Sequence, residues 1–318
     1  MIRTLLSGDL PRSRALSIVL LLILVGLAAA PFIFPGTRSL NVAAKVAVFI
    51  LLVASYDLLL GYSGIVSFAH TMFFGIGGYG VGIAAAKLGP TWWNLALGVV
   101  LALLLSLALA FAIGLLSLRV RAIFFAMITL AVASFFQILA SQLSAFTGGE
   151  DGLNFRLPEL LRGRLAAYYT VFALSLVLFL GLLRVVNSPF GRVLLAVREN
   201  EFRAEALGYR TVIYRTVANC LGALLATAAG VLYAVWLRYT GPDTTLSFAI
   251  MIDLLLMVVI GGMGTMYGAV IGAVLLVLAQ NYLQALVGDR WLLWLGVAFI
   301  LCVYFFPSGI VGRLRQRR

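Results

Sequence analysis

The sequence predicts an all-α protein that crosses a membrane about ten times. Two observations support this fold class. Of the 318 residues, 63% are hydrophobic and only 11% are charged, whereas a soluble domain carries about 25% charged residues. The apolar residues also form runs of about 20, the length that a helix needs to cross the hydrocarbon core. No polar block is long enough to build a separate core, so we expect residues 1–318 to form one transmembrane domain.

The apolar runs place the expected spans along the chain. They lie near residues 15–34, 41–60, 66–87, 93–117, 122–143, 166–186, 213–237, 248–261, 266–287 and 291–306. The first run is nearly of full membrane length and ends in Pro-Phe-Ile-Phe-Pro-Gly, so we expect a retained span rather than a cleaved signal peptide. The segments around 61–70 and 261–266 are candidates for re-entrant segments, which would reduce the count to about eight.

The net charge of +12 is explained by topology. Cytoplasmic loops carry the excess of Lys and Arg, and the arginines gather before the first span, at 119–121, across 184–215 and at 313–318. Placing these segments inside puts both termini in the cytoplasm and requires an even number of spans. Because the basic residues lie between apolar runs, we expect no nucleic-acid partner. Cys220 and Cys302 lie in apolar runs without metal-ligand spacing and are expected to pack between helices.

The most informative stretch is 58–80, which reads LLLGYSGIVSFAHTMFFGIGGYG. Irregular backbone at membrane depth is tolerated only where it is buried in protein or lines a cavity. A break in an apolar run therefore indicates a pathway through the protein rather than a simple anchor. Candidate residues of that path are the polar and glycine residues at the breaks and the carboxylates inside spans, namely Asp57, Gly61, Tyr62, Ser63, Gly64, Ser67, His70, Asp253, Gly261, Gly262 and Gly264.

Three of these residues admit more than one interpretation. His70, the single histidine, could contact substrate or titrate, but a buried, hydrogen-bonded structural role is favoured, and a histidine-based metal site is not expected. Asp57 and Asp253 each begin an Asp-Leu-Leu-Leu run, which hints at an internal repeat, although chance explains the match better. The spacing of Gly264, Gly268 and Gly272 is typical of a helix-packing face.

The longest polar stretch on the predicted inner side is the segment 187–215, which reads NSPFGRVLLAVRENEFRAEALGY and continues to Arg215. Ser188 and Pro189 suit a helix start, the following apolar residues have roughly helical spacing, and Gly208 suits a C-cap. We expect one or two short amphipathic helices that expose Arg198, Glu199, Glu201, Arg203 and Glu205. Spacing alone does not decide between a solvated loop and a docking element for a cytoplasmic protein.

The loop Gly148, Gly149, Glu150 and Asp151 falls on the predicted outer side. Its two acids could bind a divalent cation, but the run lacks the spacing of an EF-hand. We therefore favour a tight turn that shapes the outer mouth of the pathway.

Four stretches together resemble the permease subunits of branched-chain amino-acid ABC importers, in particular the LivM-like members. They are LLLGYSGIVSFAHTMFFGIGGYG at 58–80, TGGEDGL at 147–153, NSPFGRVLLAVRENEFRAEALGY at 187–209 and MVVIGGMGTMYGAVIGA at 257–273. One position departs from the family pattern: Asp57 stands where an uncharged polar residue such as Asn is expected.

The resemblance implies a membrane subunit without catalytic residues or a cofactor of its own, in the inner membrane of a bacterial cell. It pairs with a second, related permease. Two cytoplasmic ATPases use ATP and Mg below it, and a periplasmic solute-binding protein delivers substrate from above. The loop that contacts the ATPase in this family corresponds to Arg192, Arg198, Glu199, Asn200, Glu201, Arg203, Ala206, Leu207 and Gly208.

The implied mechanism is alternating access driven by the partner ATPases. The sequence itself has no Gly-Lys-Ser/Thr phosphate loop and no converging set of catalytic residues, so an enzyme or a channel is not supported. The main alternative is an ion-coupled secondary transporter that uses Asp57 or Asp253. The substrate stays open among leucine, isoleucine and valine, other amino acids, urea and small organic acids, because the binding protein largely sets selectivity.

Overall fold

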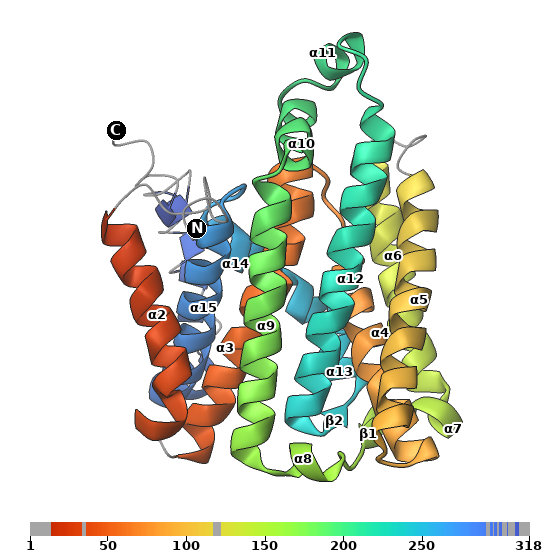
Figure 1. Cartoon of the computed structure of the whole chain (residues 1–318), viewed down its shortest axis with the longest axis vertical. Helices are drawn as coiled ribbons and strands as arrows, with labels where there is room; N and C mark the ends of the chain where they lie inside the picture. The colour runs from red at the N-terminus through yellow and green to blue at the C-terminus, as the bar shows by residue number, and fades with distance from the viewer. Residues whose placement is uncertain are drawn as a thin grey trace.

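The computed structural model describes residues 14–33, 36–116 and 122–290, together with short pieces at 293–294, 296–297, 299–300, 304 and 309–311. Within these residues the chain forms a bundle of long helices that run side by side (Figure 1). Nine of the described helical segments are long and apolar enough to cross a membrane, and they match the first nine predicted spans. The all-α polytopic fold class is confirmed. The tenth predicted span, 291–306, lies mostly outside the described residues.

The described elements follow one another in a simple up-and-down order. The long helices are α2 (Arg14–Ile33), α3 (Thr37–Asp57), α4 (His70–Ile83), α5 (Trp92–Leu116), α6 (Ala122–Gln142), α9 (Arg164–Val186), α12 (Thr211–Leu237), α14 (Phe248–Gly261) and α15 (Met266–Val287). Two π-helical turns, η1 (Leu58–Ser63) and η2 (Ala84–Leu88), extend α3 and α4. Short elements join the spans: α7 (Ser144–Thr147), η3 (Gly149–Asp151), β1 (Leu153–Asn154), α8 (Glu159–Arg162), α10 (Pro189–Glu199), α11 (Glu201–Ala206), β2 (Tyr239–Thr240), α13 (Pro242–Thr245) and η4 (Gly288–Arg290).

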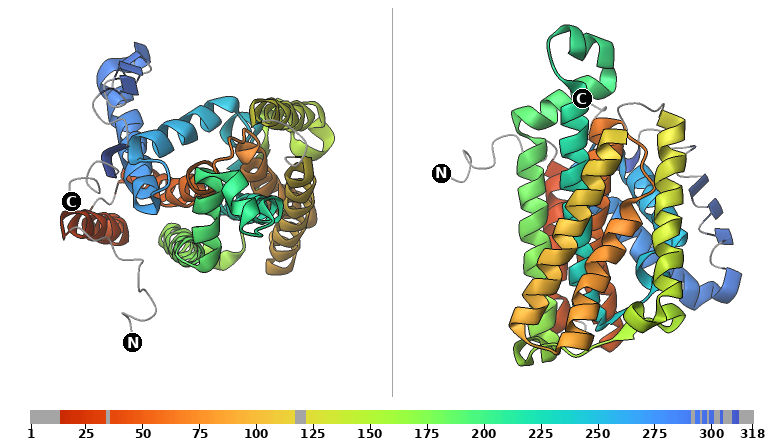
Figure 2. Two further views of the ribbon diagram at one scale, coloured as in Figure 1. Left: turned by 90° about the horizontal axis from the view of Figure 1, so that it is seen from above. Right: turned by 90° about the vertical axis from the view of Figure 1, so that its right-hand side faces the viewer.

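Helices α3, α4 and α12 form the centre of the bundle. In the span Thr37–Ser63, 83% of the most apolar stretch is buried, compared with 17% in the span Leu16–Ile33. Helix α2 lies at one edge and α5 and α6 lie at the opposite edge (Figure 2). The outer helices expose large apolar side chains, as expected where lipid replaces water, for example Leu22, Leu101 and Phe135.

The glycines of α4 let this helix approach its neighbours closely. A Cβ added to Gly77 would overlap with the carbonyl of Thr227 on α12, and a Cβ on Gly230 would overlap with the carbonyl of Phe74 on α4. Gly80 meets Gly98 of α5 in the same way. The glycines of α4 thus form a packing surface along this helix, of the kind that holds membrane helices together.

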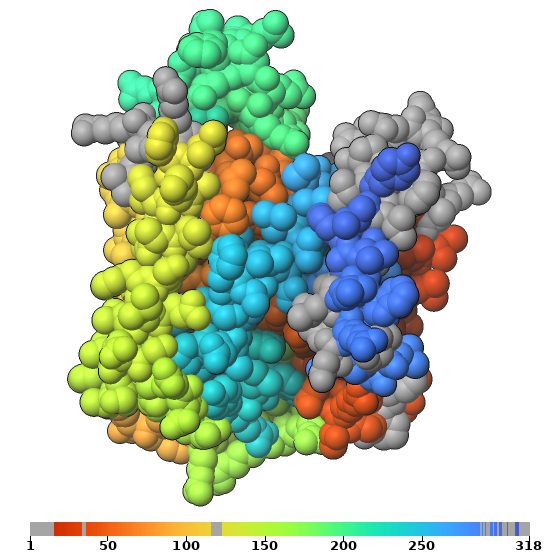
Figure 3. All heavy atoms as spheres, turned by 180° about the vertical axis from the view of Figure 1, so that it is seen from behind, coloured from red at the N-terminus to blue at the C-terminus, as the bar shows by residue number. Residues whose placement is uncertain are grey.

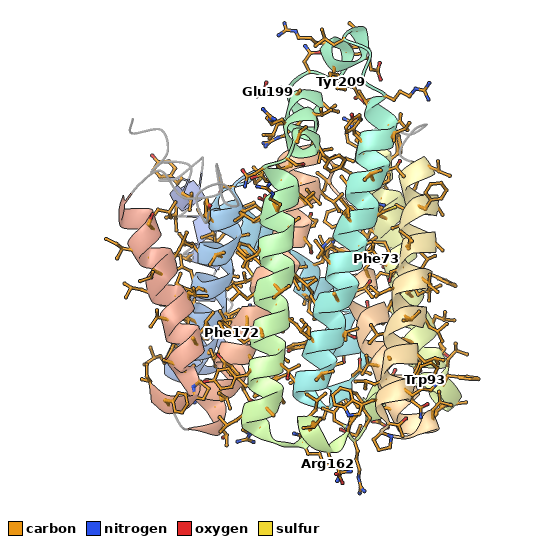
Figure 4. All side chains as sticks on the ribbon, in the orientation of Figure 1. Phe73, Trp93, Arg162, Phe172, Glu199 and Tyr209 are labelled. Atoms are coloured by element: carbon orange, nitrogen blue, oxygen red, sulfur yellow. The ribbon has the colours of Figure 1, made fainter. Side chains whose placement is uncertain are left out.

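The connecting elements gather at the two ends of the bundle. Helices α10 and α11 project at one end, where Glu199 and Tyr209 lie, and Arg162 and Trp93 lie at the other (Figure 4). There, β1 and β2 form a small antiparallel pair that aligns Leu153 with Thr240. We call these the inner and outer ends, after the sidedness predicted from the arginines.

The central packing predicts which glycines tolerate a side chain. Gly230→Leu should lower the melting temperature of the purified chain, because overpacking costs about 1–3 kcal/mol and here forces α12 away from α4. Gly181→Leu on α9 is the matched control, since a Cβ there meets no atom within 4 Å. Thermal unfolding followed by size-exclusion chromatography measures both variants, and equal melting temperatures would contradict the close packing.

Candidate functional site

The first helix break lies between α3 and α4. The chain continues from α3 through the π-helical η1 and turns at Gly64, whose φ of 72° is left-handed and suits glycine. Residues 65–69 are not helical, and α4 begins at His70. The break predicted around 61–70 is present, as the non-helical residues 64–69. This short segment links α3 and η1 to α4, within the central group of helices.

His70 fixes the start of α4 against α3. Its ring is fully buried, and its Nε2 hydrogen-bonds with the hydroxyl of Ser55 at 2.8 Å. The ring also packs on Tyr56 with the two centroids 5.2 Å apart. This geometry fits the structural interpretation of His70 better than direct contact with a solute.

The second break joins α14 to α15. Helix α14 ends at Gly261, and Gly262 and Gly264 have φ values of 114° and 76°. A Cβ on Gly268 or on Gly272 would overlap with carbonyl groups of α14. The expected break and the expected small-residue packing face are therefore both present, and they let α15 return directly alongside α14.

Asp57 connects the two breaks. Its carboxylate is 1% exposed, and its Oδ1 accepts a hydrogen bond from the backbone nitrogen of Gly264 at 2.8 Å. A Cβ on Gly61 would overlap with both of these groups, so glycine is required there. The carboxylate supplies an acceptor for a backbone N–H that the broken helix leaves without an intrahelical partner.

Arg198, near the end of α10, contacts the residues around Asp57 and Gly264. Its guanidinium donates a hydrogen bond to the carbonyl of Gly61. A Cβ on Gly264 would lie 2.9 Å from its Nη1, and a Cβ on Gly64 would lie 3.1 Å from its Cγ. We call Asp57, Gly61, Gly64, Gly264 and Arg198 the glycine junction. One side chain of the inner loop thus reaches both helix breaks.

Beyond the junction, α11 rises above the rest of the inner end (Figure 3). Asn200 caps the helix by accepting a hydrogen bond from the backbone nitrogen of Arg203 at 2.9 Å. Gly208, with a φ of 90°, and Tyr209 close its C-terminus through hydrogen bonds to Glu205 and Ala204. This is the Schellman arrangement, so the predicted C-cap at Gly208 is present.

The surface of α11 carries two large apolar side chains. Phe202 is 86% exposed and Leu207 is 73% exposed, although both lie outside the spanning helices. Exposed side chains of this kind on a projecting helix are typical of a protein contact. These two apolar side chains are therefore available for contact with another protein.

Helix α11 is tied to the start of α12. The carboxylate of Glu201 pairs with the guanidinium of Arg215 at 2.5 Å, and the hydroxyl of Thr211 donates to Glu205 at 2.8 Å. One expectation changes accordingly: Glu201 is half-buried in an ion pair rather than freely exposed. Arg198 is exposed as expected, although its guanidinium also reaches the junction.

Comparison with known proteins identifies the family to which this chain belongs. A sequence model of the family described as branched-chain amino acid transport system / permease component matches residues 38–305. The chain belongs to this family. The matched range contains both helix breaks, the glycine junction and the whole of the inner loop, so this permease carries all the features described above within the part that defines the family.

Individual relatives agree with the family. The permease is 27% identical to the high-affinity branched-chain amino acid transport system permease protein LivM of Salmonella typhimurium, over 94% of this chain and 75% of the relative. It is 25% identical to LivM of Escherichia coli, over 98% of this chain and 78% of the relative. It is also 25% identical to LivH of Salmonella typhimurium, over 83% of this chain and 91% of the relative. No solved structure matches the chain. The protein is therefore a permease subunit of an ABC importer.

Most other predicted site residues lie near the junction or on the loop. Tyr62, Ser63 and Ser67 are buried beside the first break. Arg192, Glu199, Arg203 and Ala206 are exposed on α10 and α11. The outer loop is a turn in which Gly148 and Gly149 have positive φ, next to Glu150, and the carbonyl of Asp151 accepts a hydrogen bond from the Tyr239 hydroxyl at 3.1 Å.

Asp253 is the exception, because it does not join the junction. It lies two turns before Gly261 on α14, and its Oδ2 accepts a hydrogen bond from the amide of Gln280 at 2.8 Å. Its surroundings differ from those of Asp57, so the geometry gives no support to the hint of a repeat. Sequence reasoning selected neither Gln280 nor Lys45 as a site residue, although both lie inside spanning helices.

The junction makes Asp57 a structural requirement for the second break. Asp57→Ala should leave the N–H of Gly264 buried without an acceptor, at a cost of about 1–3 kcal/mol. We therefore expect faster amide hydrogen exchange across residues 262–265 in that variant. Ser63→Ala is the matched control, because the buried Ser63 hydroxyl has no hydrogen-bond partner among the described residues. Unchanged exchange in Asp57→Ala would show that the junction does not hold the turn.

Proposed function

We propose that this permease and a second, related permease together form the translocation path of an importer for branched-chain or related amino acids in a bacterial inner membrane. The proposal for the substrate rests on the family description and on the printed names of LivM and LivH. The similarity to both LivM and LivH, which are distinct permeases, supports a heterodimer of related subunits.

The remaining partners are part of the proposal. Two cytoplasmic ATPases bind and hydrolyse ATP with Mg, and a periplasmic solute-binding protein delivers the substrate. The permease itself binds no cofactor and carries out no bond chemistry. Both of its termini lie in the cytoplasm, which follows from the arginine distribution and places α11 on the side where the ATPases reside.

The observation that carries the coupling mechanism is the position of Arg198. It sits on the helix that precedes α11, yet its guanidinium bonds to Gly61 and lies beside Gly264. A displacement of α10 would therefore act on both helix breaks at once. No other described residue of the inner loop has a hydrogen bond to either break.

The exposed side of α11 supplies the contact with the ATPase. Phe202 and Leu207 fit a groove in a protein, and Arg203 and Glu205 flank them with charges of both signs. A helix that binds lipid headgroups would present a wider apolar face and fewer acids. The ion pair of Glu201 with Arg215 ties α11 to the inner end of α12.

Transport then follows from two packing states of the same helices. Closure of the ATPase dimer moves α11, and Arg198 passes this motion to the segments at Gly64 and Gly262–Thr265. These glycine-containing breaks act as hinges, because they absorb backbone rotation that intact helices resist. ATP shifts the balance between inward-open and outward-open states by binding one of them more tightly.

The first test concerns docking. Replacing Phe202 and Leu207 with Asp should abolish co-purification of the ATPases with the tagged permease, because the apolar contact is lost. Leu160→Asp is the control, since Leu160 is 72% exposed but lies on α8 at the outer end. Retention of the ATPases by the double variant would refute the assignment of α11, and uptake driven by an ion gradient without ATPases would refute the importer itself.

The second test separates coupling from docking. Arg198→Gln should keep the ATPases bound but lower the uptake of amino acid per ATP hydrolysed by about 10-fold, the loss expected for a charge-assisted hydrogen bond. Arg210→Gln, an exposed arginine at the same end, should leave the ratio unchanged. The measurement is ATP-driven uptake and phosphate release in the same proteoliposomes. A normal ratio in Arg198→Gln would contradict the proposed role of the junction.

A further inference from the structure

Three polar side chains from three different helices meet inside the spanning region, apart from the glycine junction. Lys45 comes from α3, Asp253 from α14 and Gln280 from α15. Gln280 donates a hydrogen bond to Asp253 at 2.8 Å, and the charges of Lys45 and Asp253 attract each other. Ionisable side chains at membrane depth are costly and generally mark a path for a solute or an ion.

Lys45 and Asp253 attract each other without forming an ion pair. Among the described residues, the ion pairs with N–O distances of 4.0 Å or less are Arg162 with Glu159 and Arg215 with Glu201. Lys45 instead places its Nζ 5.2 Å from the ring centroid of Phe49. Both Lys45 and Asp253 are half-buried rather than sealed in the core. The two opposite charges thus stand apart and are accessible from outside the chain.

Further polar side chains lie near the Lys45–Asp253 pair, toward the outer end of the bundle. Arg38, Asn41 and Lys45 share one face of α3, because they are three, four and seven residues apart. Arg38 also donates a hydrogen bond to the backbone carbonyl of Asn281 on α15 at 3.3 Å. Gln280, the residue before Asn281, donates to Asp253, so polar side chains of α3 and α15 lie between the pair and the outer end.

We infer that Lys45 and Asp253 form a subsite for a zwitterion, the α-amino and α-carboxylate groups of a free amino acid, in the translocation path. The Lys45 ammonium binds the carboxylate of the solute, and the Asp253 carboxylate binds its ammonium. Gln280 holds Asp253 in place. The inference rests on the proposed function and deepens it, because it selects amino acids over urea and over organic acids that lack an amino group.

The chemistry of the pair supports a zwitterion over a solute with net charge. A bound amino acid brings one charge of each sign, so the site stays neutral overall when empty and when occupied. A net anion would leave Asp253 unpaired, and a net cation would leave Lys45 unpaired, which is costly away from water. The two opposed charges also attract each other when the site is empty, which favours release of the solute, as transport requires.

The test uses the complete importer, purified with its partner subunits and reconstituted in proteoliposomes. ATP-driven uptake of radiolabelled leucine is compared with uptake of the corresponding α-keto acid. Lys45→Gln and Asp253→Asn should each lower leucine uptake by about 10- to 100-fold, the range for one lost hydrogen bond to a charged group. Asp253→Asn should also reduce the preference for leucine over the keto acid.

Two further variants separate this role from a structural one. Replacing both residues, Lys45→Gln with Asp253→Asn, removes both charges. A pair that merely neutralises itself would regain transport in this neutral form, whereas a zwitterion subsite stays defective while the complex still assembles. Lys87→Gln is the matched control, since Lys87, the other lysine of the sequence, packs on Phe146 at the outer end.

The outcomes are distinct. Normal leucine uptake by either single variant, or recovery in the double variant, overturns the zwitterion subsite while leaving the proposed function intact. A wild-type complex that imports no amino acid at all overturns the proposed function instead. Loss of uptake in both single variants and in the double variant, with Lys87→Gln unaffected, supports the subsite.

Discussion

The hydrogen bond between the Asp57 carboxylate and the backbone of Gly264 is the interaction on which the inner half of the bundle depends. Both helix breaks interrupt membrane-spanning helices and leave backbone groups without intrahelical partners. The Asp57 carboxylate accepts a hydrogen bond from the N–H of Gly264 in the second break. The Arg198 guanidinium donates one to the carbonyl of Gly61 beside the first break. The need for glycine at 61, the close return of α15 along α14 and the position of α10 all follow from bringing these groups within reach.

The same arrangement divides the permease into a stiff part and a part that can move. Helices α4 and α12 are locked by backbone contacts at Gly77 and Gly230. The contact between the two breaks, in contrast, rests on the side chains of Asp57 and Arg198, and Arg198 belongs to the inner loop. Motion imposed on that loop therefore has an effect at the breaks rather than in the centre of the bundle. The Lys45–Asp253 pair lies on α3 and α14, the helices that lead into the breaks, so such motion would also change the spacing of its two charges.

Much of the fold could be predicted from the sequence, because a spanning helix can be recognised from its length and apolar composition alone. The breaks at Gly64 and Gly261–Gly264 were also predictable, since glycines interrupt otherwise apolar runs. The partner of Asp57 was not, because Gly264 lies 207 residues away and no local pattern pairs them. The close packing of the α4 glycines on α12 was not predictable either, because packing on a neighbouring helix and an open cavity both call for small residues. Lys45 was overlooked because a lysine near the end of an apolar run is ordinarily a topology signal.

Arg198 transmits the state of the inner loop to the second helix break. Spin labels on Met263, an exposed residue of that break, and on Val177, an exposed residue of α9, would report the movement directly. The distance between the labels is measured by pulsed electron resonance in the complete importer, without nucleotide and with ATP trapped by vanadate. The account predicts that the distance changes on trapping in the otherwise unmodified permease and not in Arg198→Gln. An equal change in both would contradict it.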